Sequence, residues 1–318
     1  MATAEVGAGG QLVLWNIQEG KRVATVVPHA EGISCISFNA DATMMVTVGL
    51  DAQHRVQIVV WDIQLLLIDR MGNATVPAPV GQHAVGLVVA KQLSDFAVNK
   101  ICFSPFEDGA LVSCGRENIR FWRIRKGHLP GRPVLLNEYS RGFIFHEIAF
   151  DTDAGAHPTD PRRPMAYVSS NKGMLIKIDC AREQILCAFQ LHHGAITAFA
   201  LRAGYAVTGG ADCRLRVWPM DFADFQLEAH HEGPVSNISI TKDGHRMLVG
   251  TAAGTLGVLD IAEHRLLLLQ HLFVCLFVCL FVCFTCVICI DFDTFFCFVN
   301  SLVLLLLLLL MLLLLLLL

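Results

Sequence analysis

Four residues of one short segment have the side chains of a reactive site: His193, Thr208, Asp212 and Trp218. A histidine, a carboxylate and a hydroxyl are the groups of a hydrolytic triad. An activated hydroxyl also needs a sharp, exposed turn and donors for an oxyanion, and the segment 207–218 (VTGGADCRLRVW) shows neither. A buried aspartate needs donors, which imidazole, hydroxyl and indole N–H groups can supply. We therefore predict a structural hydrogen-bonded set and no enzymatic activity.

The same residue types recur in full once more along the chain, and in part in a third segment. One further set has all four types, with a longer gap before its tryptophan: His29, Thr47, Asp51 and Trp61. The segment 231–260 has His231 but carries Ala253 and Leu259 where the aspartate and the tryptophan would stand. We expect this segment to be held mainly by apolar packing.

Neighbouring histidines could suggest a metal site, at His192-His193 and at His230-His231-Glu232. Adjacent residues on a strand point to opposite faces, so both members of a pair cannot easily reach one ion. The glycines of 7–10 (GAGG) are not followed by the lysine or the helix pattern of a phosphate-binding loop. We therefore expect no metal, no catalytic residue and no cofactor.

A recurring strand with a tryptophan or an aliphatic residue near its end must position these side chains. Its marker residues are Trp15, Trp61, Trp122, Ile178, Trp218 and Leu259, which lie 46, 61, 56, 40 and 41 residues apart. The last two spacings match the repeat of ~40–45 residues that is typical of WD40 propellers. The longer spacings require insertions, and the Gly-, Pro- and Asp-rich segments 69–80 and 151–164 are expected to be loops.

The repeat therefore predicts an all-β fold that resembles the WD40 β-propeller family. Five blades are expected, at about 29–62, 83–123, 141–179, 193–219 and 231–260, with blade-closing residues Trp15, Trp122, Ile178 and Leu259 outside the two full sets. A fragment of a sixth blade, made only of final-strand material, ends at Trp15, so we expect an incomplete propeller. Such blades usually display loops for protein partners.

Composition divides the chain into a propeller region, 1–264, and a low-complexity hydrophobic tail, 265–318. Residues 1–265 carry 24 basic and 26 acidic side chains, because Asp291 and Asp293 are the only charges beyond Arg265. This balance argues against binding of nucleic acid. The six cysteines before the tail are scattered in apolar runs and are expected to be buried free thiols in a reducing cytoplasm.

The tail begins with three Leu-Phe-Val-Cys repeats and ends in 302–318, where 15 of 17 residues are leucine. Two apolar runs lie on either side of Asp291 and Asp293. Each run is long enough to cross a membrane as a helix, so a helical membrane anchor is one interpretation. A four-residue repeat followed by nearly pure leucine is also typical of translated simple-repeat DNA. An error in the gene model is therefore the favoured interpretation.

Three segments resemble the WD repeat-containing protein 90 family, which is associated with centrioles and cilia. They are 111–125 (LVSCGRENIRFWRIR), 143–151 (FIFHEIAFD) and 214–235 (RLRVWPMDFADFQLEAHHEGPV). The last is the most specific, because 219–222 (PMDF) is not a general WD40 feature. The resemblance covers roughly residues 1–263.

The resemblance implies a scaffold on the centriolar microtubule wall, needed for centriole architecture and primary cilium formation. Its partners would be proteins, such as tubulin or centriolar scaffold proteins, and its location the cytoplasm and cytoskeleton, at the centriole, the centrosome or the cilium base. The family's N-terminal microtubule-contacting domain has no counterpart here. The alternative is a membrane-anchored WD-repeat adaptor, if residues 266–318 are real.

One basic group could serve a partner directly: Arg120, Arg123, Arg125 and Lys126. Its simplest interpretation is a solvated strand end. Docking onto an acidic surface such as a microtubule is the alternative.

Overall fold

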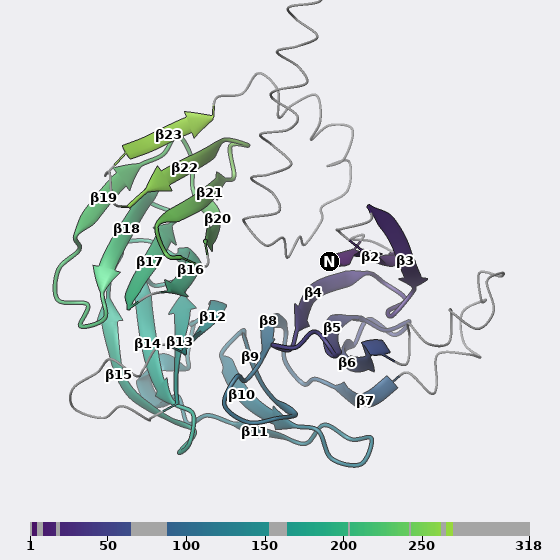
Figure 1. The fold of residues 1–318 in the computed structure, drawn as a ribbon. Coiled ribbons are helices and arrows are strands. Elements are labelled where there is room, and N and C mark those ends of the chain that lie inside the picture. Colours follow the sequence, from purple (N-terminus) through teal and green to yellow (C-terminus); the bar gives the residue numbers. More distant parts are fainter. Residues whose placement is uncertain are drawn as a thin grey trace, which may run out of the picture.

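The computed structural model describes residues 2–4, 9–16, 20–64, 88–152, 164–202, 204–241, 243–261 and the backbone of 265–269. In this part of the chain, six antiparallel sheets follow one another around an arc (Figure 1). The all-β propeller predicted from the repeat is confirmed. The predicted fragment is a sheet of three strands, not final-strand material alone.

The strands run in chain order from one sheet to the next. The first sheet has β1 (Ala2–Ala4), β2 (Leu12–Asn16) and β3 (Lys21–Val26), and the second has β4 (Ile33–Phe38), β5 (Met44–Leu50), β6 (Val56–Asp62) and β7 (Val88–Leu93). The third has β8 (Val98–Phe103), β9 (Ala110–Gly115), β10 (Asn118–Arg123) and β11 (Gly131–Pro133), followed by the short 3₁₀ helix η1 (Asn137–Tyr139). The fourth has β12 (Phe145–Asp151), β13 (Met165–Ser170), β14 (Met174–Asp179) and β15 (Gln184–Gln190). The fifth has β16 (Ile196–Arg202), β17 (Tyr205–Gly210), β18 (Arg214–Pro219) and β19 (Leu227–His230), and the sixth has β20 (Val235–Ile240), β21 (Arg246–Thr251), β22 (Leu256–Asp260) and β23 (Arg265–Leu269).

The marker residues lie on the third strand of each four-stranded sheet, not on the last. Trp61 is on β6 and Trp218 on β18, and a fourth strand pairs with each of these. Three of these fourth strands lack a clear apolar period, because β11 and β19 are short and β15 is largely exposed. The expected blade ends consequently fall one strand too early.

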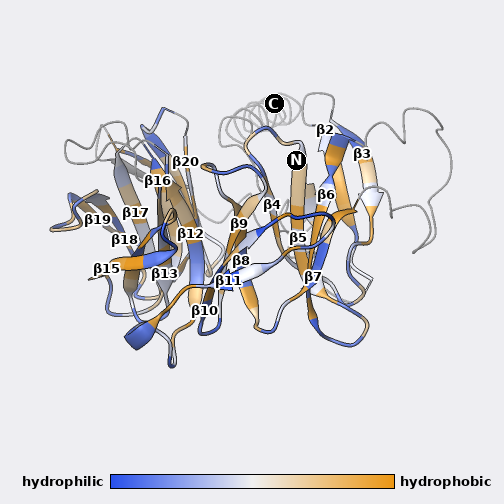
Figure 2. Ribbon diagram, turned by 90° about the horizontal axis from the view of Figure 1, so that it is seen from below, coloured by the Kyte–Doolittle hydropathy of each residue, from blue (hydrophilic) through white to orange (hydrophobic). Residues whose placement is uncertain are grey.

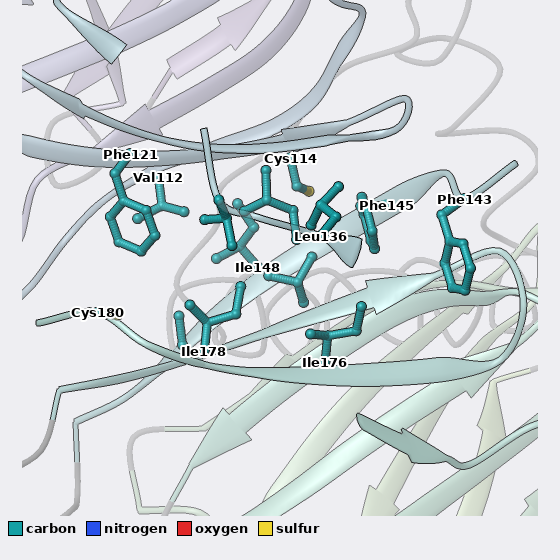
Figure 3. Close-up of a cluster of buried hydrophobic side chains, with 14 residues drawn as sticks. Val112, Cys114, Phe121, Leu136, Phe143, Phe145, Ile148, Ile176, Ile178 and Cys180 are labelled. Carbon is teal, nitrogen blue, oxygen red and sulfur yellow. The ribbon is translucent and has the colours of Figure 1, made fainter. Parts of the chain in front are cut away.

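Packing between consecutive sheets explains why most residues of the middle strands are buried. β9 is buried at all six positions, because one face meets the second sheet and the other meets the fourth. Each of five buried clusters joins two consecutive sheets. Figure 3 shows the cluster in which Val112 and Phe121 of the third sheet pack against Ile148 and Ile178 of the fourth. In Figure 2 the strands are mostly orange and the connecting loops mostly blue.

Each four-stranded sheet has an irregularity at the start of its first strand. The register against the second strand shifts at Ile33/Cys35, Val98/Lys100, Phe145/Ile148, Ile196/Ala198 and Val235/Asn237. A β-bulge of this kind breaks the strict alternation of side chains. The first strands therefore match a period of two only roughly.

The loop that enters a sheet crosses very close to the end of the second strand. A Cβ atom on Gly115 would lie 1.8 Å from the carbonyl oxygen of Ala97, and one on Gly49 would lie 2.2 Å from that of Gly32. Only glycine fits such an approach without displacing the backbone.

Polar contacts also join the first strands of neighbouring sheets. Lys100 on β8 forms an ion pair of 3.0 Å with Glu147 on β12, and the amide of Asn99 donates to the carbonyl of Phe145 at 2.8 Å. The hydroxyl of Thr197 on β16 donates to the carbonyl of Val235 on β20. Because hydrogen bonds and ion pairs depend on geometry, these contacts help to fix how each first strand lies against the next.

The sixth sheet extends into the predicted tail, because the backbone of β23 pairs with β22. The expected loop 69–80, most of the loop 151–164, and the tail from residue 270 lie outside the described residues. Among the described residues, no helix is long and apolar enough to cross a membrane.

Candidate functional site

The fifth sheet brings one hydrogen-bonded set together at the end of β17. His192 Nε2 lies 2.7 Å from Thr208 Oγ1, and Trp218 Nε1 donates to the same hydroxyl oxygen at 2.8 Å. His192 Nδ1 lies 3.0 Å from both carboxylate oxygens of Asp212. Since the Thr208 oxygen accepts from the indole, its proton can be donated to Nε2, which leaves Nδ1–H to donate to Asp212.

The histidine of this set is His192, not the predicted His193. The backbone N–H groups of Leu191 and His192 both donate to the carbonyl oxygen of Gly173, which fixes the entering loop. The His192 ring then points into the blade at 2% exposure, while His193 is exposed. Because the two histidines are adjacent, the sequence pattern alone could not show which of them enters the blade.

Burial and hydrogen bonding set the charges of this pair. Burial lowers the pKa of His192, against the opposing effect of Asp212. Burial alone would raise the pKa of Asp212, but the hydrogen bond and charge interaction with His192 and the N–H of Arg214 lower it overall. Thr208 has no exposed surface, and both its neighbours already use its hydroxyl. The imidazole, hydroxyl and carboxylate of this set are therefore engaged with one another inside the blade.

The second sheet assembles three of its four predicted residues. His29 Nε2 lies 2.9 Å from Thr47 Oγ1, and Trp61 Nε1 donates to that oxygen at 3.0 Å. Asp51 instead accepts at 2.9 Å from the backbone N–H and the guanidinium of Arg55. His29 Nδ1 is buried without a hydrogen-bond partner in the described part of the chain. Burial, with the nearby charge of Lys91, lowers the pKa of His29 to about 4.

The longer turn after Asp51 explains this difference. Asp51 precedes Trp61 by ten residues, whereas Asp212 precedes Trp218 by six. The added residues bring Arg55, whose guanidinium forms an ion pair with Asp51. The aspartate therefore finds its donors within its own turn, and the histidine is left with one hydrogen bond.

A hydroxyl acceptor for the indole recurs at every tryptophan of the chain. Beyond Thr208 and Thr47, Trp122 donates to Ser113 at 2.8 Å and Trp15 donates to Thr3 at 2.9 Å. Sequence reasoning missed Thr3 and Ser113. A hydroxyl nine to fourteen residues before each tryptophan was the available signal.

Two sheets lack this arrangement. Ile178 and Leu259 occupy the tryptophan position with 0% and 1% exposure. His231 is 8% exposed, and neither of its ring nitrogens has a hydrogen-bond partner among the described residues. Burial and His230 lower the pKa of His231.

The basic group divides into a structural half and an exposed half. Arg120 forms an ion pair of 2.6 Å with Asp95 and lies over the rings of Phe96 and Trp122. Arg123 forms ion pairs with Glu107 at 3.0 Å and with the nearly buried Glu183 at 2.6 Å. Two others, Arg125 and Lys126, lie exposed in the turn beyond β10.

The cysteines before the tail are free, and their exposure varies. Cys35, Cys114 and Cys180 are buried, Cys102 and Cys213 are half-buried, and Cys187 is exposed, unlike the expectation for all six. Across the ranges that the structure covers, no three His, Cys, Asp or Glu side chains are grouped to hold a metal ion.

Comparisons with known proteins agree with this architecture. Residues 20–56 match the WD domain, G-beta repeat family. The β-propeller domain of Cps50 (Swd1) from Myceliophteria thermophila superposes with a TM-score of 0.64, covering 85% of this chain and 83% of that one, at 12% sequence identity. This structural similarity shows the fold alone.

Sequence relatives are more specific. Centriole proteome protein 16 of Chlamydomonas reinhardtii is 33% identical over 278 residues, which is 83% of this chain and 13% of that protein. WD repeat-containing protein 90 is 32% identical in Xenopus tropicalis and 30% identical in Homo sapiens, each over 82% of this chain. The chain spans only 14% and 15% of the length of these two relatives. The chain is therefore a WD40 β-propeller segment whose sequence places it in the WD repeat-containing protein 90 family.

Proposed function

We propose that this chain is a non-enzymatic scaffold segment that binds proteins at the centriole and the cilium base. The observation that carries the proposal is the sequence similarity to Centriole proteome protein 16 and WD repeat-containing protein 90 over four fifths of the chain. More distant relatives are Cilia- and flagella-associated protein 251 of Chlamydomonas reinhardtii, at 25% identity, and Echinoderm microtubule-associated protein-like 2 of Rattus norvegicus, at 28%. These names support a role beside microtubules, with tubulin or other centriolar scaffold proteins as partners.

The chemistry of the blades supports the same proposal. The histidine, threonine and aspartate that could suggest a hydrolase are engaged with one another, and Thr208 is fully buried. A scaffold needs rigid sheets that hold exposed loops in place, and the interlocked blades supply such a support. The contribution of the segment would be to architecture: it holds other components of the centriolar wall in position.

Localisation of the full chain tests the proposal. A tagged full chain is expressed in ciliated cells and stained together with a centriole marker and a membrane marker. The proposal expects a signal that coincides with the centriole marker and remains after detergent extraction. A diffuse signal, or one that follows the membrane marker and is lost in detergent, would overturn it.

A matched variant separates folding from binding. Thr208→Val destabilises the fifth blade, while Thr208→Ser keeps the hydroxyl that His192 and Trp218 share. If recruitment depends on the folded propeller, Thr208→Ser retains the centriolar signal and Thr208→Val weakens it. Equal recruitment of an unfolded chain would contradict a propeller scaffold.

A further inference from the structure

A pocket lies between the second and third sheets on the side of the propeller. Its volume is about 520 Å³, and it is lined by Gln92 on β7 and by four residues of the segment between β10 and β11: Arg125, Lys126, His128 and Pro130. In Figure 1 the β10–β11 connection runs beneath β7. Two consecutive sheets thus build one hollow.

The cations at this pocket are available to a partner. Arg120 and Arg123 are neutralised by Asp95, Glu107 and Glu183. In contrast, neither Arg125 nor Lys126 forms an ion pair within the described ranges, and both are exposed. The two cations therefore place uncompensated positive charge at the rim of a hollow whose own lining is almost entirely apolar, although the propeller region as a whole is nearly neutral.

The turn that carries these cations has a fixed shape. Arg125 and His128 exchange two backbone hydrogen bonds of 2.9 Å, and the two residues between them, Lys126 and Gly127, have φ angles of +46° and +84°. This is the arrangement of a tight two-residue hairpin turn. The fully buried Leu129 anchors the turn to the core. A cation on a preorganised turn loses less conformational freedom when it binds than one on a free loop.

We propose that this pocket, built by Gln92 and the turn Arg125–Pro130, binds an acidic segment of a partner protein. The inference deepens the proposed scaffold function and rests on it. A guanidinium can pair with a carboxylate through two parallel hydrogen bonds, an ammonium pairs as a point charge, and a hollow of this size accepts a few side chains. The nearly balanced charge of the propeller region favours a short acidic peptide over a nucleic acid.

Another basic surface lies at the opposite end of β10, roughly 20 Å away for a strand of this length. It contains Arg116, Arg141 and Lys172, but Glu117 lies among them and accepts a hydrogen bond from the N–H of Gly142. Lys172 is held 4.0 Å from the centre of the Phe143 ring and donates to the Arg141 carbonyl. This surface is partly compensated, which makes it a suitable control.

The test measures binding of the full chain to an immobilised peptide of alternating Glu and Gly, with a Gln-and-Gly peptide for comparison, by biolayer interferometry. Arg125→Glu combined with Lys126→Glu reverses both pocket charges. Arg116→Glu combined with Arg141→Glu makes the same charge change at the other end of β10. Circular dichroism first verifies that both double variants keep the wild-type thermal midpoint; if the pocket variant does not, Arg125→Gln with Lys126→Gln replaces it.

The proposal expects the pocket variant to bind the acidic peptide about tenfold more weakly, since reversal removes two exposed ion pairs and adds repulsion. The control should change binding by less than about twofold, and added salt should weaken wild-type binding. Equal loss in the control would assign binding to the other surface. Absence of wild-type binding, equal binding of the Gln peptide, or equally tight binding of a single-stranded oligonucleotide would also overturn the proposal. If the chain localises to the centriole but does not bind the peptide, only this site is refuted. If it binds the peptide but does not localise to the centriole, the proposed location is refuted.

Discussion

Replacement of Thr208 by valine removes the hydroxyl that joins the fifth blade while it preserves the shape of the side chain. Two buried nitrogens, His192 Nε2 and Trp218 Nε1, would then lose their partner. A buried polar group without a partner costs about 1–3 kcal/mol, so for two nitrogens we expect a loss of about 2–6 kcal/mol in the free energy of unfolding. Thr208→Ser keeps the hydroxyl and removes one methyl group, which costs about 1 kcal/mol.

Urea denaturation followed by circular dichroism measures both variants. A double-mutant cycle with Trp218→Phe isolates the indole bond, because removal of the indole N–H leaves one nitrogen fewer to be orphaned by Thr208→Val. The cycle should give a coupling on the order of 1 kcal/mol. If Thr208→Val is no more destabilising than Thr208→Ser, or if the two single changes are strictly additive, the hydroxyl does not hold the blade in the way described.

Three further predictions concern histidines and one glycine. His29 has a pKa of about 4 in the folded protein and 6.5 in the unfolded chain. Its contribution to the free energy of unfolding is therefore complete above pH 6.5 and is lost as the pH falls towards 4, by about 3 kcal/mol in total. In urea titrations at several pH values, His29→Gln should make this decline less steep. His231→Leu should leave the thermal midpoint unchanged or raise it, because both nitrogens lack partners in the described structure, whereas His192→Leu should lower it clearly; the opposite order would contradict the assignment. Gly115→Ala should cost about 3 kcal/mol or more in urea unfolding, because its Cβ would lie 1.8 Å from a backbone oxygen, and a neutral result would show that the entering loop can move away.

The repeat of strands could be predicted because its marker residues are few and conspicuous. Trp61, Trp122 and Trp218 each lie on a third strand, most of whose inner residues are buried between neighbouring sheets. The second strands β5, β9, β13 and β17 are buried along most of their length as well, so the centre of these blades is visible in the sequence. The outer strand β15 has four exposed positions among its seven residues and no marker residue, so it could not be separated from a loop by its period.

The hydrogen-bonded sets were harder to predict because they depend on loop geometry. The choice between His192 and His193 is decided by the two hydrogen bonds to the Gly173 carbonyl, which belongs to the preceding sheet. The diversion of Asp51 depends on where a longer turn places Arg55. Neither contact follows from spacing along the chain.

The four tryptophans can also serve as intrinsic fluorescence probes of unfolding. Trp15, Trp61, Trp122 and Trp218 lie in the first, second, third and fifth sheets, and each indole donates to one hydroxyl. Variants that retain one indole at a time would thus report on one blade at a time through its emission spectrum, while the fourth and sixth sheets stay silent. Because the buried clusters join only consecutive sheets, coincident red shifts would indicate that the neighbours melt together, and staggered shifts would reveal the order in which the blades separate.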